Sequence, residues 1–174
     1  MNEPESWLDQ PNLRLTALLR RLTDGRVDFV IVGGVAVIMQ GAARFTKDLD
    51  ICYSGDSQNL DRLGIVLTSL NARLRGVEDD VPFIPDGRTL RHTQILTLTT
   101  PDGNLDLLVK PDGSPDYKTL RAQANQVDLD GFSVRIASVE DMIAMKRASA
   151  RAQDLVDLES LEIARRRKRS SRRS

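Results

Sequence analysis

Gly33-Gly-Val-Ala-Val37 and Thr46-Lys-Asp-Leu-Asp-Ile51 are the two stretches that decide the fold of this chain. Residues 28–33, which lead into the glycine pair, form a short β-branched run that is typical of a strand buried on both faces. A short helix is expected next, over 35–41. Residues 48–53 then alternate polar and apolar side chains, which is the period of a strand with one solvated face.

The rest of the chain supplies helices and a hairpin around these two strands. Leucines at helical spacing predict a first helix over 13–22, and Thr100-Pro-Asp-Gly103 is a strong turn signal. Ser138, with Asp141 three residues later, opens a helical C-terminal segment, either one helix or two with a joint near 150–153. The other expected elements are a helix over 58–74, hairpin strands over 93–99 and 104–109, a helix over 116–126, and strands over 127–130 and 132–136.

This element order predicts the α+β class, with a small mixed sheet, helices on one face and a C-terminal helical segment. A helix before the first strand and a hairpin after the third helix argue against a regular Rossmann fold. We expect a core over residues 1–137, a helical segment over 138–164 packed on it, and a basic, flexible tail over 165–174.

The neutral composition hides a charge asymmetry. Lys+Arg and Asp+Glu number 25 each among the 174 residues, so the formal net charge is zero. The last ten residues carry seven basic side chains and no acid, which leaves 18 basic and 25 acidic groups elsewhere, a net charge of −7. The longest apolar run, 29–39, is too short to span a bilayer, and the acidic N-terminus is unlike a signal peptide. We therefore expect a cytoplasmic protein without a membrane partner.

Three carboxylates are candidate metal ligands. Asp48 and Asp50 lie two residues apart in a predicted strand, so both side chains project from one face and repel each other unless a cation lies between them. Asp106 lies on a predicted neighbouring strand and would add a third ligand. Hard divalent cations, Mg²⁺ above all, bind such oxygens together with substrate phosphates. The glycine pair after the first strand would let backbone N–H groups approach a phosphate.

Together these motifs resemble the signature of the nucleotidyltransferase superfamily, which has the polymerase-beta-like fold. The similarity begins in the two opening stretches with Gly41 and Arg44 between them, and continues in 100–108, 138–146 and 153–158. More narrowly, the chain is similar to the minimal nucleotidyltransferases and to the AbiEii/MenT-type toxin branch. The resemblance covers residues 27–161.

The resemblance implies an enzyme that moves a nucleoside monophosphate from an NTP to an acceptor hydroxyl and releases pyrophosphate. It assigns catalysis and metal binding to Asp48, Asp50 and Asp106, with Mg²⁺ as the expected ion and Mn²⁺ as the alternative. Lys146 is expected to be catalytic, as a residue that neutralises the triphosphate. The expected nucleotide-binding residues are Gly33, Gly34, Arg44, Thr46 and Lys47.

Two positions depart from the family pattern. Gly34 stands where the first motif usually has serine, and Gln153 stands where the joint before the last helix often has lysine. Each change removes a side chain that could contact phosphate. Whether Asp154 and Asp157 take part stays open. The single cysteine, Cys52, cannot form an internal disulfide or a thiolate zinc site and is expected to be a core residue. His92 has no partner at a useful spacing, so it is expected to be a structural or surface residue.

The acceptor stays open at this stage. The resemblance favours the 3′ end of tRNA, as in the toxin branch, and the basic C-terminus favours RNA because an acidic body needs basic surface to approach a polyanion. Alternatives are a partner protein modified by an antitoxin-type enzyme, a non-catalytic binding partner with the same fold, and a small antibiotic. A cognate toxin or antitoxin protein would be a further partner.

Overall fold

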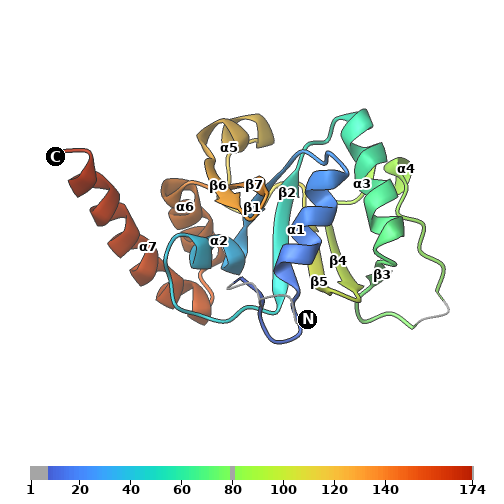
Figure 1. Ribbon diagram of the computed structural model, residues 1–174, viewed down its shortest axis with the longest axis horizontal. Coiled ribbons are helices and arrows are strands. Elements are labelled where there is room, and N and C mark those ends of the chain that lie inside the picture. The colour runs from blue at the N-terminus through green and yellow to red at the C-terminus, as the bar shows by residue number, and fades with distance from the viewer. Residues whose placement is uncertain (1–7, 79–80, 174) are drawn as a thin grey trace.

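The computed structural model describes residues 8–78 and 81–173 (Figure 1). In these ranges seven strands form one sheet in the order β3-β4-β5-β2-β1-β7-β6. The pairs β1–β7 and β2–β5 are parallel and the other neighbouring pairs are antiparallel. The strands are β1 Phe29–Val32, β2 Asp48–Tyr53, β3 Arg73–Leu74, β4 Ile95–Thr100, β5 Gly103–Leu108, β6 Asn125–Leu129 and β7 Phe132–Ile136.

Helices of very different length accompany this sheet. They are α1 Leu15–Asp24, α2 Gly33–Met39, α3 Ser57–Ser69, α4 Gly87–Arg91, α5 Tyr117–Gln123, α6 Val139–Ser149 and α7 Ala152–Ser171. The mixed sheet and the C-terminal helical pair confirm the predicted α+β class. None of the helices in the described ranges has the length and apolar character that crossing a bilayer requires.

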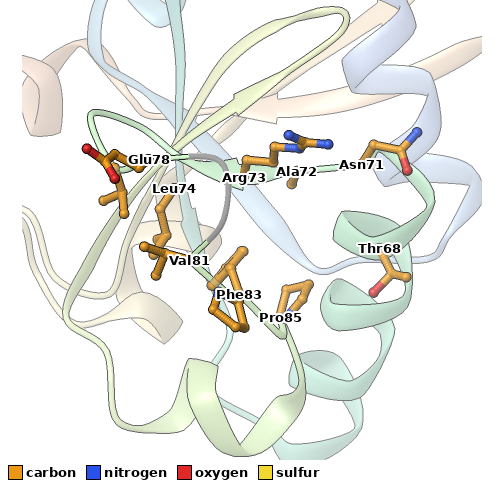
Figure 2. A pocket seen from close by; sticks show the side chains of 11 residues that line it. Thr68, Asn71, Ala72, Arg73, Leu74, Glu78, Val81, Phe83 and Pro85 are labelled. Carbon is orange, nitrogen blue, oxygen red and sulfur yellow. The ribbon is translucent and has the colours of Figure 1, made fainter.

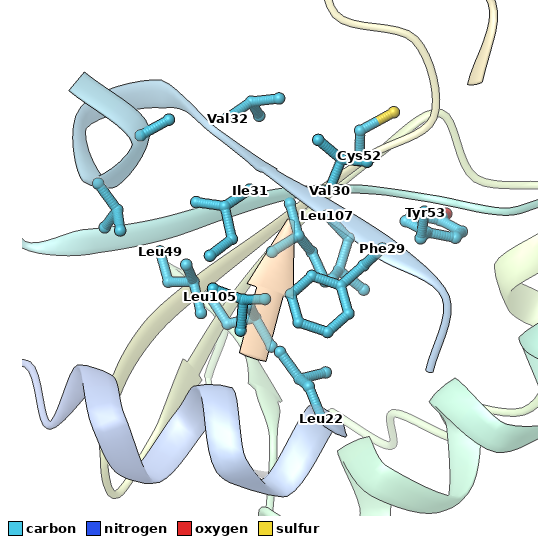
Figure 3. Close-up of a cluster of buried hydrophobic side chains, with 14 of the residues drawn as sticks. Leu22, Phe29, Val30, Ile31, Val32, Leu49, Cys52, Tyr53, Leu105 and Leu107 are labelled. Carbon is cyan, nitrogen blue, oxygen red and sulfur yellow. The ribbon is translucent and has the colours of Figure 1, made fainter. Parts of the chain in front are cut away.

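The main core lies between α1 and the sheet. The buried leucine stripe of α1 includes Leu22, and Figure 3 shows its side chain beside those of Phe29 and Leu105. Leu49 belongs to the same cluster and is fully buried. Because side chains alternate along a strand, burying Leu49 against α1 turns its neighbours in β2 to the opposite face of the sheet.

The third predicted helix ends earlier than the sequence suggested. Helix α3 stops at Ser69, and residues 73–74, predicted as helix, form strand β3 against β4. Asn71 adopts a left-handed backbone (φ 50°), and the N–H of Ala72 donates to the carbonyl of Leu67 to close the last turn. Asparagine tolerates this conformation better than most residues, so it ends the helix five residues before the glycine at 76. The short helix α4 was also not predicted.

The C-terminal segment consists of two helices. As expected, the Ser138 hydroxyl caps α6 by accepting a hydrogen bond from the Asp141 N–H (3.0 Å). The joint lies at Ala150, which has a left-handed backbone (φ 49°, ψ 32°) and ends α6. Residues 165–171, for which we expected a flexible tail, continue α7 as a helix. The domain division at residue 164 stays a prediction.

Replacing Ala150 with glycine is expected to raise the free energy of unfolding by about 0.5–1 kcal/mol. An L-residue in the left-handed region costs roughly 1–2 kcal/mol, and the greater freedom of glycine in the unfolded chain offsets only part of that gain. Ala144, exposed in the middle of α6, is the matched control, because glycine there should lower the free energy by about 0.5–1 kcal/mol. Urea unfolding measures both. A loss at position 150 equal to that at position 144 would contradict the left-handed joint.

Candidate active site

The parallel pairing of β2 with β5 brings the predicted carboxylates to one face of the sheet. In this register Asp50 is level with Asp106, and Asp48 is level with Asn104. Neighbouring residues in paired strands share a face, and this face is opposite the one that packs on α1. The Asn104 amide donates to Asp48 Oδ1 (2.9 Å) and thereby orients that carboxylate.

Arg75 is a site residue that sequence reasoning missed. Its guanidinium pairs with Asp106 Oδ1 through Nη2, and Nη1 lies 3.7 Å from Asp48 Oδ1. The same Nη2 donates to the carbonyl of Leu98 in β4 (3.0 Å). The predicted helix over 58–74 placed this arginine just beyond a helix end, where no local pattern ties it to a carboxylate.

The charges of this site act on one another. Burial raises the pKa of Asp50 to about 7, and the nearby carboxylates of Asp106 and Asp48 add to the increase, while Lys146 and Arg75 oppose it. Burial also raises the pKa of Asp106, although its contact with Arg75 works in the other direction. Burial and the mutual repulsion of the carboxylates together outweigh the effect of the two nearby cations on Asp50.

The glycine pair lies directly against these groups. Gly33 follows β1 without a loop and has φ +66°, and a Cβ at this position would collide with the Asp50 carboxylate. A Cβ on Gly34 would come within 3.0 Å of Thr46 Oγ1 and 3.3 Å of the Arg44 guanidinium. Only residues without a side chain allow β1 and α2 to approach the site so closely.

A buried ion network lies where α6 and α7 meet. Lys146 Nζ is 2.8 Å from Asp154 Oδ1 and 2.9 Å from Asp157 Oδ2, and Arg44 Nη1 is 2.5 Å from the same Asp157 oxygen. Asp154 and Asp157 are only 5% and 1% exposed. Pairing with these cations offsets the free-energy cost of burying the two carboxylates. Burial acts to raise the pKa of Asp154, but hydrogen bonds from Lys146, Ser149 and the Arg151 N–H outweigh it and bring the pKa below its usual value.

The structure thus brings most of the predicted residues together. Lys47 is exposed, and its role stays a prediction. Cys52 is buried at the far end of β2, where its thiol donates to the carbonyl of Val109, and burial raises its pKa to about 12, which fits the structural role expected for it. His92 is exposed just after α4. Asn104 was within reach of sequence reasoning, because it lies two residues before Asp106 on the same strand face.

Beside the carboxylates the sheet is open to solvent. Thr97, which is paired with Asp106, and Thr99 are exposed on β4, and Ile95 is 64% exposed. A pocket of about 350 Å³ lies farther out, where the end of α3, β3 and the following loop meet (Figure 2). Its lining includes Asn71, Leu74 and Phe83 but none of the predicted site residues.

Comparison with known proteins identifies the family. The family model described as the nucleotidyl transferase AbiEii toxin of a type IV toxin–antitoxin system matches residues 17–165. The chain belongs to this family. It is therefore a nucleotidyltransferase, which confirms the predicted enzyme class and the toxin–antitoxin relationship. A sequence search against curated proteins returned no match.

Solved structures support the fold of this nucleotidyltransferase. The lincosamide antibiotic adenylyltransferase LnuA, with lincomycin bound, is 17% identical with a TM-score of 0.59, over 87% of this chain and 98% of that one. The antibiotic-resistance factor ANT(2″)-Ia is 16% identical with a TM-score of 0.56, over 91% and 90%. A nucleotidyltransferase-like protein from Paracoccidioides brasiliensis is 20% identical with a TM-score of 0.51, over 86% and 75%.

The donor chemistry of the site fits a divalent cation. Three carboxylates on adjacent strands present only oxygen ligands, and burial, together with the neighbouring Asp106 and Asp48 carboxylates, raises the pKa of Asp50. In the described ranges, however, no three His, Cys, Asp or Glu side chains are gathered tightly enough to hold a metal ion. The guanidinium of Arg75 lies against two of the three carboxylates instead.

Asp50→Asn is expected to stabilise the protein at pH 8 in EDTA, because it removes a charge that burial disfavours and that the Asp106 and Asp48 carboxylates repel. Each pKa unit of unfavourable shift corresponds to roughly 1.4 kcal/mol, so we expect a gain of about 1–3 kcal/mol in unfolding free energy. Asp61→Asn, at an exposed position of α3, is the control and should stay within about 0.5 kcal/mol of wild type. Destabilisation by Asp50→Asn would mean that favourable contacts of this group outweigh the cost of its burial and of the repulsion.

Proposed function

We propose that this nucleotidyltransferase is metal-dependent and transfers a nucleoside monophosphate from an NTP to the 3′ end of tRNA. One observation carries the proposal: three carboxylates share one sheet face, with a glycine pair on one side of them and an open strand surface on the other. This order supplies a place for the triphosphate, for the reacting centre and for the acceptor.

The triphosphate would lie over Gly33 and Gly34, where the absence of side chains leaves the backbone N–H groups accessible. Lys146 is within electrostatic range of Asp50, and Arg44 lies against Gly34, so both cations would neutralise the phosphates. Asp154 and Asp157 would keep these two cations in position.

The reacting centre would be at Asp48, Asp50 and Asp106, which would hold Mg²⁺ or Mn²⁺. The ion would supply charge neutralisation of the phosphates and of the attacking oxygen. Asp106 lies nearest the open face of β4, so it would accept the proton of the acceptor hydroxyl. Such a transfer depends mainly on positioning and electrostatics, for which this small set of side chains is sufficient.

A nucleic-acid acceptor is favoured by the basic end of α7. This helix starts in the ion network at Asp157 and extends away from the sheet (Figure 1). Arg169 lies twelve residues farther along, roughly 18 Å at 1.5 Å per residue. An acceptor that contacts both the site and the exposed basic turns must span this distance. An RNA strand can do so, whereas a small antibiotic cannot.

The test is to incubate the protein with each α-³²P-labelled NTP and Mg²⁺ in the presence of total tRNA, of the protein encoded beside it, or of neither. We expect labelled tRNA, and we expect Asp48→Asn and Asp106→Asn to lower the rate at least about 1,000-fold. Asp112→Asn, at an exposed position after β5, is the charge-matched control and should keep the wild-type rate.

The outcomes of this assay separate the alternatives. Label in the partner protein alone would favour an antitoxin-type enzyme and contradict the tRNA assignment. No transfer to either acceptor under any NTP would favour a non-catalytic binding partner. Retention of more than a tenth of the activity by Asp106→Asn would contradict the proposed role of the third carboxylate.

Neutralising Arg166, Arg167 and Arg169 to glutamine is expected to raise the KM for tRNA at least about fivefold. Fewer phosphate contacts release fewer counterions, so the slope of log KM against log salt should also fall by about 2. NTP affinity, measured by thermal shift with Mg²⁺, should not change. Arg88→Gln combined with Arg91→Gln, in the exposed α4 on the opposite side of the molecule (Figure 1), is the control. An unchanged KM would remove the support for a nucleic-acid acceptor.

A further inference from the structure

Arg75 is the side chain that most closely engages the carboxylates of the site. It follows β3, and its own N–H donates to the carbonyl of Thr97 (2.9 Å), which continues the pairing with β4 by one residue. Thr97 is level with Asp106 in β5, and Asp106 is level with Asp50 in β2. The backbone pairing therefore aims Arg75 along the same row of the sheet that carries the two carboxylates.

The guanidinium lies against two of the three carboxylates that would hold the proposed cation. It pairs with Asp106 Oδ1 and lies 3.7 Å from Asp48 Oδ1, so it touches carboxylates on both β5 and β2. Its Nη2 also donates to the carbonyl of Leu98, and the side chain is 30% exposed. A guanidinium and a divalent cation are both held by carboxylate oxygens, and the same oxygen cannot serve both fully at short range.

Among the residues that the structure describes, the guanidinium of Arg75 does not have a hydrogen-bond partner for every N–H group. Its buried Nε donates to no acceptor within the described part of the chain. A buried donor without a partner costs free energy, so the position is less stable than one in which every N–H is paired. Because the side chain is partly exposed, the guanidinium can move from the carboxylates into solvent. These features suit a counter-ion that can be displaced rather than a permanent structural pair.

We propose that Arg75 is the resident counter-ion of this site and competes with the divalent cation for Asp48 and Asp106. The inference rests on the proposed metal dependence. In the cation-free protein Arg75 offsets the repulsion among the carboxylates, and cation binding requires it to leave them. Arg75 thereby weakens binding of a cation that arrives alone.

The test measures binding of Mn²⁺ alone, with free Mn²⁺ counted by electron paramagnetic resonance, in wild type, Arg75→Gln and Arg91→Gln. We expect Arg75→Gln to bind Mn²⁺ at least about tenfold more tightly and to have a lower Tm than wild type in EDTA. Arg91→Gln removes the same charge from an exposed position in α4 and should match wild type in Mn²⁺ affinity. Asp50→Asn added to Arg75→Gln should abolish the tighter binding, which assigns it to this site.

Other outcomes overturn the inference in distinguishable ways. Equal Mn²⁺ affinity in wild type and Arg75→Gln would overturn the competition while leaving the proposed metal dependence intact. A lower NTP affinity at saturating Mn²⁺, without tighter Mn²⁺ binding, would instead make Arg75 a phosphate ligand. No Mn²⁺ binding by either protein would overturn both proposals. If Arg75→Gln does not fold, Arg75→Lys takes its place, because lysine cannot span both carboxylates and should bind Mn²⁺ with intermediate affinity; unchanged affinity would overturn the competition.

Discussion

The parallel pairing of β2 with β5 is the constraint on which the site depends. Its register sets Asp50 beside Asp106, and the burial of Leu49 against α1 fixes which face both carboxylates occupy. A shift of one residue in this pairing would turn the acids toward the core, where unpaired charge is far more costly than any packing gain. The apolar face of the sheet therefore stabilises an arrangement that electrostatic repulsion opposes.

Two cations from distant parts of the chain offset the repulsion among the three carboxylates. Arg75 approaches along β4 and pairs with Asp106, while Lys146 approaches from α6 and also acts on Asp50. Lys146 is itself held by Asp154 and Asp157 at the start of α7. The two cations differ in their surroundings: Lys146 has two buried carboxylates of its own, whereas Arg75 relies on the carboxylates of the site. This difference is why we assign Lys146 to the phosphates and Arg75 to exchange with a cation.

Local patterns in the sequence were enough to predict the elements that carry the acids. The alternation over 48–53 gave the bounds of β2, and the turn at 100–103 gave the β4–β5 hairpin, because strand period and turn chemistry are local properties. The cap at Ser138 was predicted for the same reason. The features that the sequence patterns did not predict depend on long-range contacts. Strand β3 forms because β4 offers it an edge, and the contact of Arg75 with Asp106 exists only once β3, β4 and β5 are assembled.

The joint at Ala150 links the site to the basic end of the chain. If α6 continued without a break, Asp154 and Asp157 would follow the axis of α6 and could not turn back to Lys146 eight and eleven residues earlier. The left-handed residue reverses the chain, so the first turns of α7 pack on α6 and deliver both carboxylates to that lysine. The same reversal sets the direction in which the remaining turns leave the sheet (Figure 1). One strained residue thus determines both how the lysine is held and where the basic turns extend, which gives the exposed arginines a fixed position relative to the site.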